Sequence, residues 1–170
     1  FLSGRCFNQE SKTPYQPFRD ILSEYIDRVK KLEPAQKEKT ILRLKESLGQ
    51  LGEIILKINP NMEDLLGKQP ALVPLEPEKE HRRLLMVASK FFLELGTSFE
   101  PVVLFLDNLQ WSDEASLSLL SEITSQIKDF SLLILGTYRD NEIGQTHSLN
   151  EIIQETKTKG YPIEEIALNL

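Results

Sequence analysis

Apolar residues recur every three or four positions through most of the first hundred residues, which is the spacing of an amphipathic helix. One such tract opens at Thr13-Pro14 and is broken by Pro34. A second tract follows, is weakened at Gly49 and Gly52, and ends at Asn59-Pro60. We therefore expect this part of the chain to be mainly helical.

The most regular helical pattern covers Glu78 to Leu95 and follows a segment rich in proline. Residues 67–77 hold Pro70, Pro74 and Pro77, which predicts a loop rather than a helix. Gly96 comes directly after the last apolar position of the helix. Glycine is common just past a helix end, so the pattern predicts a C-terminal cap there.

Short unbroken apolar runs replace the helical spacing after residue 100. Val102–Leu106 and Leu132–Leu135 each have the length of a strand buried on both faces. Between them, Ser112-Asp113-Glu114 is a typical helix start, and apolar residues at helical spacing follow it. Two strands joined by a helix form a βαβ crossover, so the sheet is expected to be parallel.

Both ends of the chain also have strand-like patterns. The Phe1–Phe7 segment is typical of a strand, and apolar residues alternate with other residues over 166–170, which predicts a closing strand. Leu149, Ile152 and Ile153 indicate a further helix before it. Because both ends look cut from a longer polypeptide, we interpret the chain as a fragment.

These elements predict an α/β fold, a three-layer sandwich with a parallel sheet and a large helical insertion. At 170 residues the chain has the size of one domain. Within that domain we assign residues 8–100 to a mainly helical insertion and residues 101–170 to the α/β core.

Composition narrows the function classes. A net charge of −6 argues against a direct nucleic-acid surface, which needs excess Lys and Arg. No apolar run approaches the roughly 18 residues of a membrane span. Cys6 is the sole cysteine, which fits a reducing compartment, and we expect a cytoplasmic location without a membrane partner.

Asp107 and Asn108 come directly after the first buried strand. Ligands of parallel α/β sheets bind at the carboxyl ends of the strands. In P-loop nucleotidases an acid at such a strand end holds the Mg²⁺ of a bound nucleotide. Asn108 follows where a second acid is usual, and an amide can orient water but cannot take its proton. The alternatives are a core strand that ends in Asp107 by chance, and Asn108 as a simple turn residue.

Thr137 and Arg139 follow the second buried strand. Neighbouring strand ends share one edge of a sheet, so Arg139 is expected near Asp107, where a guanidinium can bind a γ-phosphate and Thr137 adds a polar contact. The alternative is a surface ion pair of Arg139 with Asp140 or Glu142, which contributes little. Trp111 and Tyr138 are expected to pack under the loops.

Two blocks carry a resemblance to a known family. Leu104–Asp113 (LFLDNLQWSD), followed by Ala115–Leu120, resembles the Walker B block of STAND-type ATPases. Leu133–Glu142 (LILGTYRDNE) resembles the next strand of that family, whose terminal arginine senses the γ-phosphate. Gly4–Phe7 and Thr13–Phe18 are similar to the strand and helix entry that follow the P-loop helix. The likeness is closest to AAA-like ATPase modules of bacterial signalling proteins, including MalT-type regulators and hybrid serine/threonine–histidine kinases.

Two departures from the family pattern stand out. The family usually has two consecutive acids where this chain has Asp107-Asn108. No G-x-x-x-x-G-K-[ST] motif occurs, and Gly67-Lys68-Gln69 is its nearest partial match. We expect the P-loop to precede Phe1, and we expect negligible ATP binding by these residues alone, because the P-loop supplies most of the phosphate contacts.

The resemblance implies a P-loop NTPase-like switch domain that binds ATP and Mg²⁺ and hydrolyses ATP within a larger signalling protein. Asp107 would hold the metal, Asn108 would lie near the water, and Thr137 and Arg139 would contact the nucleotide. The implied partners are ATP and other domains of the polypeptide (kinase, sensor or DNA-binding modules), and a nucleotide-dependent oligomer is compatible with this interpretation. The alternative is a non-catalytic interaction scaffold on a degenerate NTPase fold.

Overall fold

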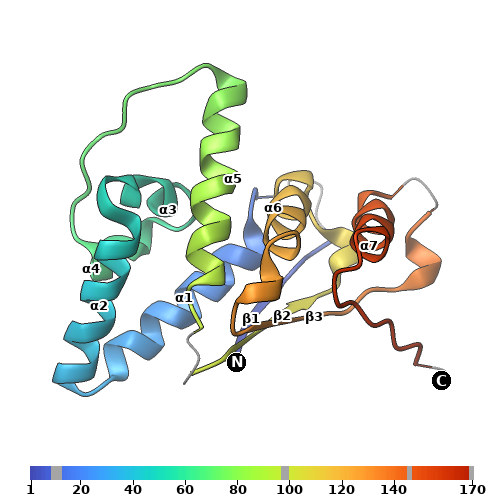
Figure 1. The fold of residues 1–170 in the computed structure, drawn as a ribbon, viewed down its shortest axis with the longest axis horizontal. Coiled ribbons are helices and arrows are strands. Elements are labelled where there is room, and N and C mark those ends of the chain that lie inside the picture. The colour runs from blue at the N-terminus through green and yellow to red at the C-terminus, as the bar shows by residue number, and fades with distance from the viewer. Residues whose placement is uncertain (9–12, 97–99, 145–146, 169–170) are drawn as a thin grey trace.

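The computed structural model describes residues 1–8, 13–96, 100–144 and 147–168 (Figure 1). These residues form three strands and a set of helices in the following order: β1 (Leu2–Arg5), α1 (Gln16–Lys31), α2 (Pro34–Leu48), α3 (Gly52–Ile58), α4 (Glu63–Leu66), α5 (Pro77–Leu93), β2 (Val102–Asp107), α6 (Glu114–Thr124), β3 (Leu132–Gly136) and α7 (Ser148–Thr158). Helices α1 to α5 lie between β1 and β2, and α6 lies between β2 and β3. Prolines stand in the first turn of α1, α2 and α5, where a missing N–H costs nothing.

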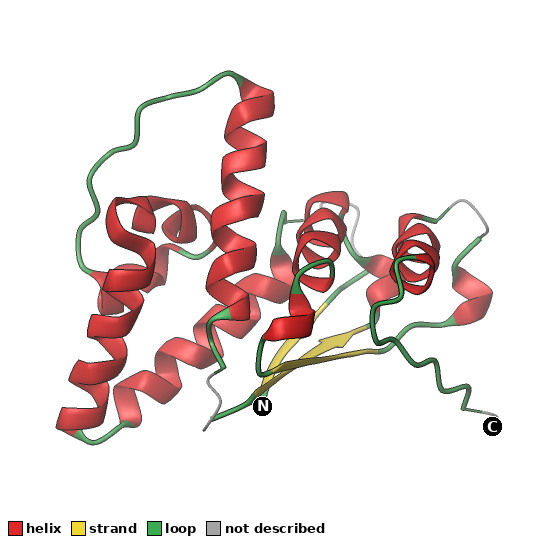
Figure 2. Cartoon of the chain, in the orientation of Figure 1, coloured by secondary structure: helices red, strands yellow, loops and turns green. Residues whose placement is uncertain are grey.

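The sheet is parallel and its strands lie in the order β1-β2-β3. Leu2 pairs with Leu104, and Leu104 pairs with Ile134, so the three strands run in register. Figure 2 shows this small sheet beside the helices. The α/β class, the parallel sheet and the βαβ crossover predicted from the apolar runs are confirmed.

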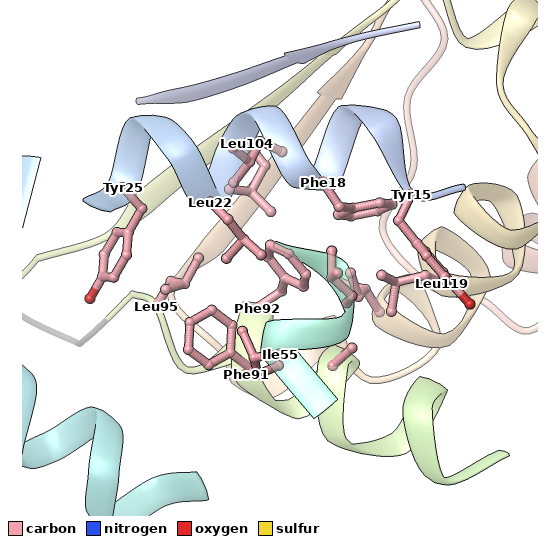
Figure 3. Packing of buried hydrophobic residues seen from close by; sticks show 14 of the residues in the cluster. Tyr15, Phe18, Leu22, Tyr25, Ile55, Phe91, Phe92, Leu95, Leu104 and Leu119 are labelled. Carbon is pink, nitrogen blue, oxygen red and sulfur yellow. The ribbon is translucent and has the colours of Figure 1, made fainter. Parts of the chain in front are cut away.

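The core lies where helices meet one face of this sheet. Leu104 of β2 is fully buried together with Phe18 of α1, Phe92 of α5 and Leu119 of α6. The rings of Phe18 and Phe92 are tilted at a centroid distance of 5.0 Å (Figure 3). Aromatic side chains bury the largest apolar areas, so these contacts fix α1 and α5 against the strands.

The other face of the sheet carries apolar side chains that the described residues leave partly uncovered. Phe105 is half-buried, and Leu133 and Leu135 of β3 are exposed. Their register positions place Val103 beside Leu133 and Phe105 beside Leu135 on this face. The edge of β3 away from β2 has no paired strand among the described residues.

Helix α1 is joined to β1 by polar contacts and by close backbone packing. The Ser3 N–H and hydroxyl both donate to Glu24 Oε2, at 2.8 and 3.0 Å. Burial raises the pKa of Glu24, but hydrogen bonds from Ser3 and Arg28 outweigh it and the pKa lies below its usual value. A Cβ on Gly4 would lie 2.0 Å from the Pro17 carbonyl oxygen, so this approach requires glycine. The end of β1 is thereby fixed relative to α1.

Two local predictions were wrong. Helix α5 ends at Leu93 with Glu94 as its C-cap, so Gly96 does not cap it. Gly96 instead lies against the Ser131 carbonyl, where a Cβ would approach to 2.2 Å. Residues 166–168 of the expected closing strand have no regular structure, and Ile166 and Leu168 are 77% and 88% exposed. Residues 169 and 170 lie outside the described residues.

Candidate functional site

The three strands end at one edge of the sheet, and a polar side chain stands at or just beyond each end. The register pairs Arg5 of β1 with Asp107 of β2 and Leu106 with Gly136 of β3, so Thr137 is the next residue along. Backbone bonds continue past the strand ends, since the Cys6 N–H donates to the Asp107 carbonyl and the Thr137 N–H to the Leu106 carbonyl, both at 2.9 Å. The backbone hydrogen bonds of the sheet therefore fix these strand ends relative to one another.

Asp107 is the centre of the hydrogen-bond network at this edge. Its Oδ2 accepts from Arg5 Nε at 2.8 Å and from Asn108 Nδ2 at 3.1 Å. Its Oδ1 accepts from the Thr137 hydroxyl at 2.7 Å. The Asp107 side chain is 21% exposed, so the carboxylate still reaches solvent.

Asn108 begins the turn that follows β2. Its φ of 60° lies in the left-handed region, which asparagine tolerates better than most residues. Its N–H donates to Thr137 Oγ1 at 3.0 Å. The turn role considered from the sequence is thus present, and the side-chain amide also contacts Asp107.

Arg139 lies at the same edge, three residues beyond the end of β3. Its Nη1 donates to Glu142 Oε1 at 2.8 Å, and its guanidinium lies 5.6 Å from the centre of the Trp111 ring. The Arg139 side chain is 61% exposed. The surface pair with Glu142, considered from the sequence as an alternative, is therefore the contact that the structure has.

Two aromatic residues at this edge pack as predicted and also make polar contacts. Trp111 is half-buried against the core, and its Nε1 donates to Glu142 Oε2 at 2.8 Å. The Tyr138 hydroxyl donates to Glu165 Oε1 at 2.6 Å. That hydrogen bond, together with burial, raises the pKa of Tyr138 to about 12. Residue Glu165 of the carboxyl-terminal segment is thus attached next to the site.

Asp113 connects the turn after β2 to two helices. Its Oδ1 accepts from the Ser116 N–H at 2.8 Å and its Oδ2 from the Ser116 hydroxyl at 2.6 Å, which makes it the N-cap of α6. Oδ1 also accepts from the Tyr15 N–H at 3.4 Å, just before α1. The helix start predicted at Ser112-Asp113-Glu114 is confirmed, with Asp113 as its N-cap.

Arg5 is the residue of this edge that the sequence analysis did not single out. The strand-end reasoning applied to Asp107 and Arg139 fits Arg5 equally well. The strand is four residues long and contains Ser3 and Gly4, so it lacks the unbroken apolar run that marks β2 and β3. Its end was for that reason harder to locate.

A small cleft lies beside this edge, and Asp107, Asn108, Thr137 and Arg139 do not line it. This cleft of about 160 Å³ lies between Cys6, Gln16, Trp111 and Asp113. Small-molecule pockets usually measure roughly 300 Å³ or more. This cleft is therefore smaller than a typical ligand pocket.

The chemistry of the edge fits Mg²⁺ better than a transition metal. Among the described residues, no three His, Cys, Asp or Glu side chains form a metal cluster. Mg²⁺ is usually held through one or two carboxylates, with waters and substrate phosphates completing its shell. Asp107, with the Asn108 amide and Thr137 hydroxyl beside it, offers oxygen ligands of that kind.

Comparison with known proteins identifies the family of this chain. The family described as AAA ATPase domain matches residues 1–135. The chain belongs to this family, and the resemblance to AAA-type ATPase domains is thereby confirmed. Proteins of this family generally use ATP and Mg²⁺.

One curated relative comes from a signalling protein. The hybrid signal transduction histidine kinase G of Dictyostelium discoideum is 28% identical over 120 residues, which is 71% of this chain. The chain spans 4% of the length of that relative. No solved structure matches the chain. None of the helices in the described ranges has the length and apolar character that crossing a bilayer requires.

Proposed function

We propose that this chain is part of an ATP-binding and ATP-hydrolysing switch domain in a larger signal-transduction protein. The observation that carries the proposal is the shared edge of the sheet, where Asp107 at the end of β2 is hydrogen-bonded to Thr137 just beyond β3. Arg139 comes two residues after Thr137. Family membership supports the nucleotide, and the kinase relative supports the signalling context.

In this proposal each residue has a distinct task. Asp107 accepts hydrogen bonds from waters of the nucleotide-bound Mg²⁺, which is the largest local charge. Asn108 orients the attacking water without taking its proton, so hydrolysis is slow. Thr137 contacts the nucleotide as a lesser polar group.

Arg139 would bind the γ-phosphate. Its present partner, Glu142, forms an exposed ion pair, and such pairs contribute about 1 kcal/mol or less. A phosphate offers the guanidinium two parallel hydrogen bonds and more charge. An exchange of Glu142 for phosphate would release Glu142 Oε1 and take the guanidinium from beside the Trp111 ring.

The switch would act through other parts of the same polypeptide. Nucleotide with Mg²⁺ favours one arrangement of domains, and hydrolysis resets it. We propose kinase, sensor or DNA-binding modules as partners, a cytoplasmic location, and assembly that depends on nucleotide. The domain division into a helical insertion over 8–100 and an α/β core over 101–170 belongs to the same proposal.

The direct test is calorimetric titration of the full-length protein with ATP, with and without Mg²⁺. We expect saturable binding that tightens when Mg²⁺ is present, and negligible binding by the 170-residue chain. A full-length protein that binds no ATP in either condition would overturn the proposal.

Replacing Arg139 by alanine in the full-length protein should uncouple nucleotide state from output. Without the guanidinium, the domain distinguishes ATP from ADP less well, and we expect a tenfold or larger loss of that discrimination. The ratio of the ATP and ADP dissociation constants measures it. Lys128→Ala removes a cation outside this edge and should leave the ratio unchanged; an unchanged ratio in R139A as well would remove the assignment.

A non-catalytic scaffold remains a second candidate, and Asn108 is the residue that favours it. An amide at this position removes the usual proton acceptor. The two candidates differ in turnover, since a scaffold retains the fold and releases no phosphate from ATP. A degenerate P-loop in the full-length sequence would favour the scaffold.

A further inference from the structure

The ion pair between Arg5 and Asp107 has no role in the function proposed above. Arg5 Nε donates to Asp107 Oδ2 at 2.8 Å across the register pair that ends β1 and β2. Its side chain is 61% exposed, so the pair lies at the surface of the edge and not in the core. A purely structural ion pair with this exposure would contribute little to stability.

We propose that Arg5 is a positioning residue that occupies the metal-binding carboxylate until Mg²⁺ displaces it. This inference rests on the proposed function, because it concerns the residue assigned to Mg²⁺. Its consequence is that the Mg²⁺ concentration needed to load the site is set by competition with a guanidinium on the neighbouring strand.

The hydrogen bonds of Asp107 show why competition is expected. Arg5 and Asn108 both donate to Oδ2, and Thr137 donates to Oδ1. A hydrated Mg²⁺ also has to donate to these oxygens through its waters. Of the three groups present, only Arg5 carries a charge, and two cations beside one carboxylate repel each other. Arg5 is therefore the group that has to leave.

The exposure of Arg5 makes that departure easy, and an acidic neighbour can receive it. The backbone N–H of Arg5 already donates to Asp20 Oδ2 on α1 at 3.2 Å, and Gln16 Nε2 donates to Asp20 Oδ1 at 2.7 Å. A guanidinium released from Asp107 can pair with this carboxylate. Metal loading at β2 would then strengthen the contact between β1 and α1.

The test is the Mg²⁺ dependence of ATP binding by the full-length protein. Arg5→Gln removes the competing cation, so half-maximal binding of ATP should occur at a threefold to tenfold lower Mg²⁺ concentration. Arg5→Lys keeps the charge but loses the fixed geometry of the guanidinium, and should give a smaller shift in the same direction. Arg28→Gln breaks the Arg28–Glu24 pair of 2.7 Å on α1 and serves as the matched control, with no shift expected.

A second measurement needs neither ATP nor turnover. Mn²⁺ added to the 170-residue chain should broaden the amide resonances of Asn108 and Thr137, and R5Q should show this broadening at lower Mn²⁺ than wild type. Equal Mn²⁺ or Mg²⁺ midpoints in wild type and R5Q would overturn the inference. So would weaker ATP binding by R5Q at saturating Mg²⁺, since that result means Arg5 contacts phosphate.

The failure of this inference is distinguishable from failure of the proposed function. A full-length protein that binds ATP with Mg²⁺, and whose R5Q variant has the wild-type midpoint, refutes the role of Arg5 alone. A full-length protein that binds no ATP refutes both.

Discussion

Asp107→Asn in the full-length protein should lower the rate of ATP hydrolysis by about 100- to 1000-fold. Asparagine has the shape of aspartate and can still accept from Thr137, but it lacks the charge that holds Mg²⁺. A metal ion contributes several kcal/mol of charge stabilisation in the transition state, and each 1.4 kcal/mol corresponds to about a factor of ten. Phosphate release at saturating ATP measures the effect.

A matched control for this variant is Asp64→Asn. Asp64 pairs with Lys30 at 2.6 Å on the exposed surface of the helical part, and the same change of charge there should leave hydrolysis unaltered. Wild-type turnover by D107N would contradict the assignment of Asp107. Equal losses in both variants would mean that the charge change acts through folding.

Gly4→Ala should produce the second large effect, on stability. The new Cβ would lie 2.0 Å from the Pro17 carbonyl oxygen, and backbone on both sides has to shift to admit it. Overpacking of this kind costs about 1–3 kcal/mol. Urea denaturation of the 170-residue chain should show a lower midpoint with an unchanged slope.

Gly144→Ala is the control for this substitution, because no atom of the described residues, chain neighbours aside, lies within 4 Å of a Cβ at Gly144. The free energy of unfolding of this variant should stay within about 0.5 kcal/mol of wild type, as for most surface changes. If G4A had the same urea midpoint as G144A, the close approach of β1 to α1 would not be the constraint on the end of β1.

The fold was predictable wherever apolar spacing is regular. The run Val102–Leu106 has the length of one buried strand, and it forms β2. The apolar residues after Glu114 have helical spacing, and they form α6. The spacing of apolar residues led to wrong predictions where the local structure depends on a residue that is distant in sequence. Gly96 is needed for its contact with Ser131, and alternating residues at 166–168 form no strand because no paired partner is present among the described residues.

The candidate site was predictable in its position and less so in its contacts. The strand-end argument brings Asp107 and Thr137 together, and they share a hydrogen bond. The same argument does not select among several acceptors within reach of one flexible side chain, and Arg139 pairs with Glu142. Which acceptor a long cation takes depends on the local turn geometry, which residue order does not reveal.

Asp113 gives the turn after β2 a mechanical role. One carboxylate oxygen accepts hydrogen bonds from the backbone N–H groups of Tyr15, just before α1, and of Ser116, in the first turn of α6, although these residues lie far apart in sequence. A small displacement of this turn, such as ligand exchange at Asp107 would cause, would therefore move α1 and α6 at the same time. The helical part would then tilt together with α6 about Asp113.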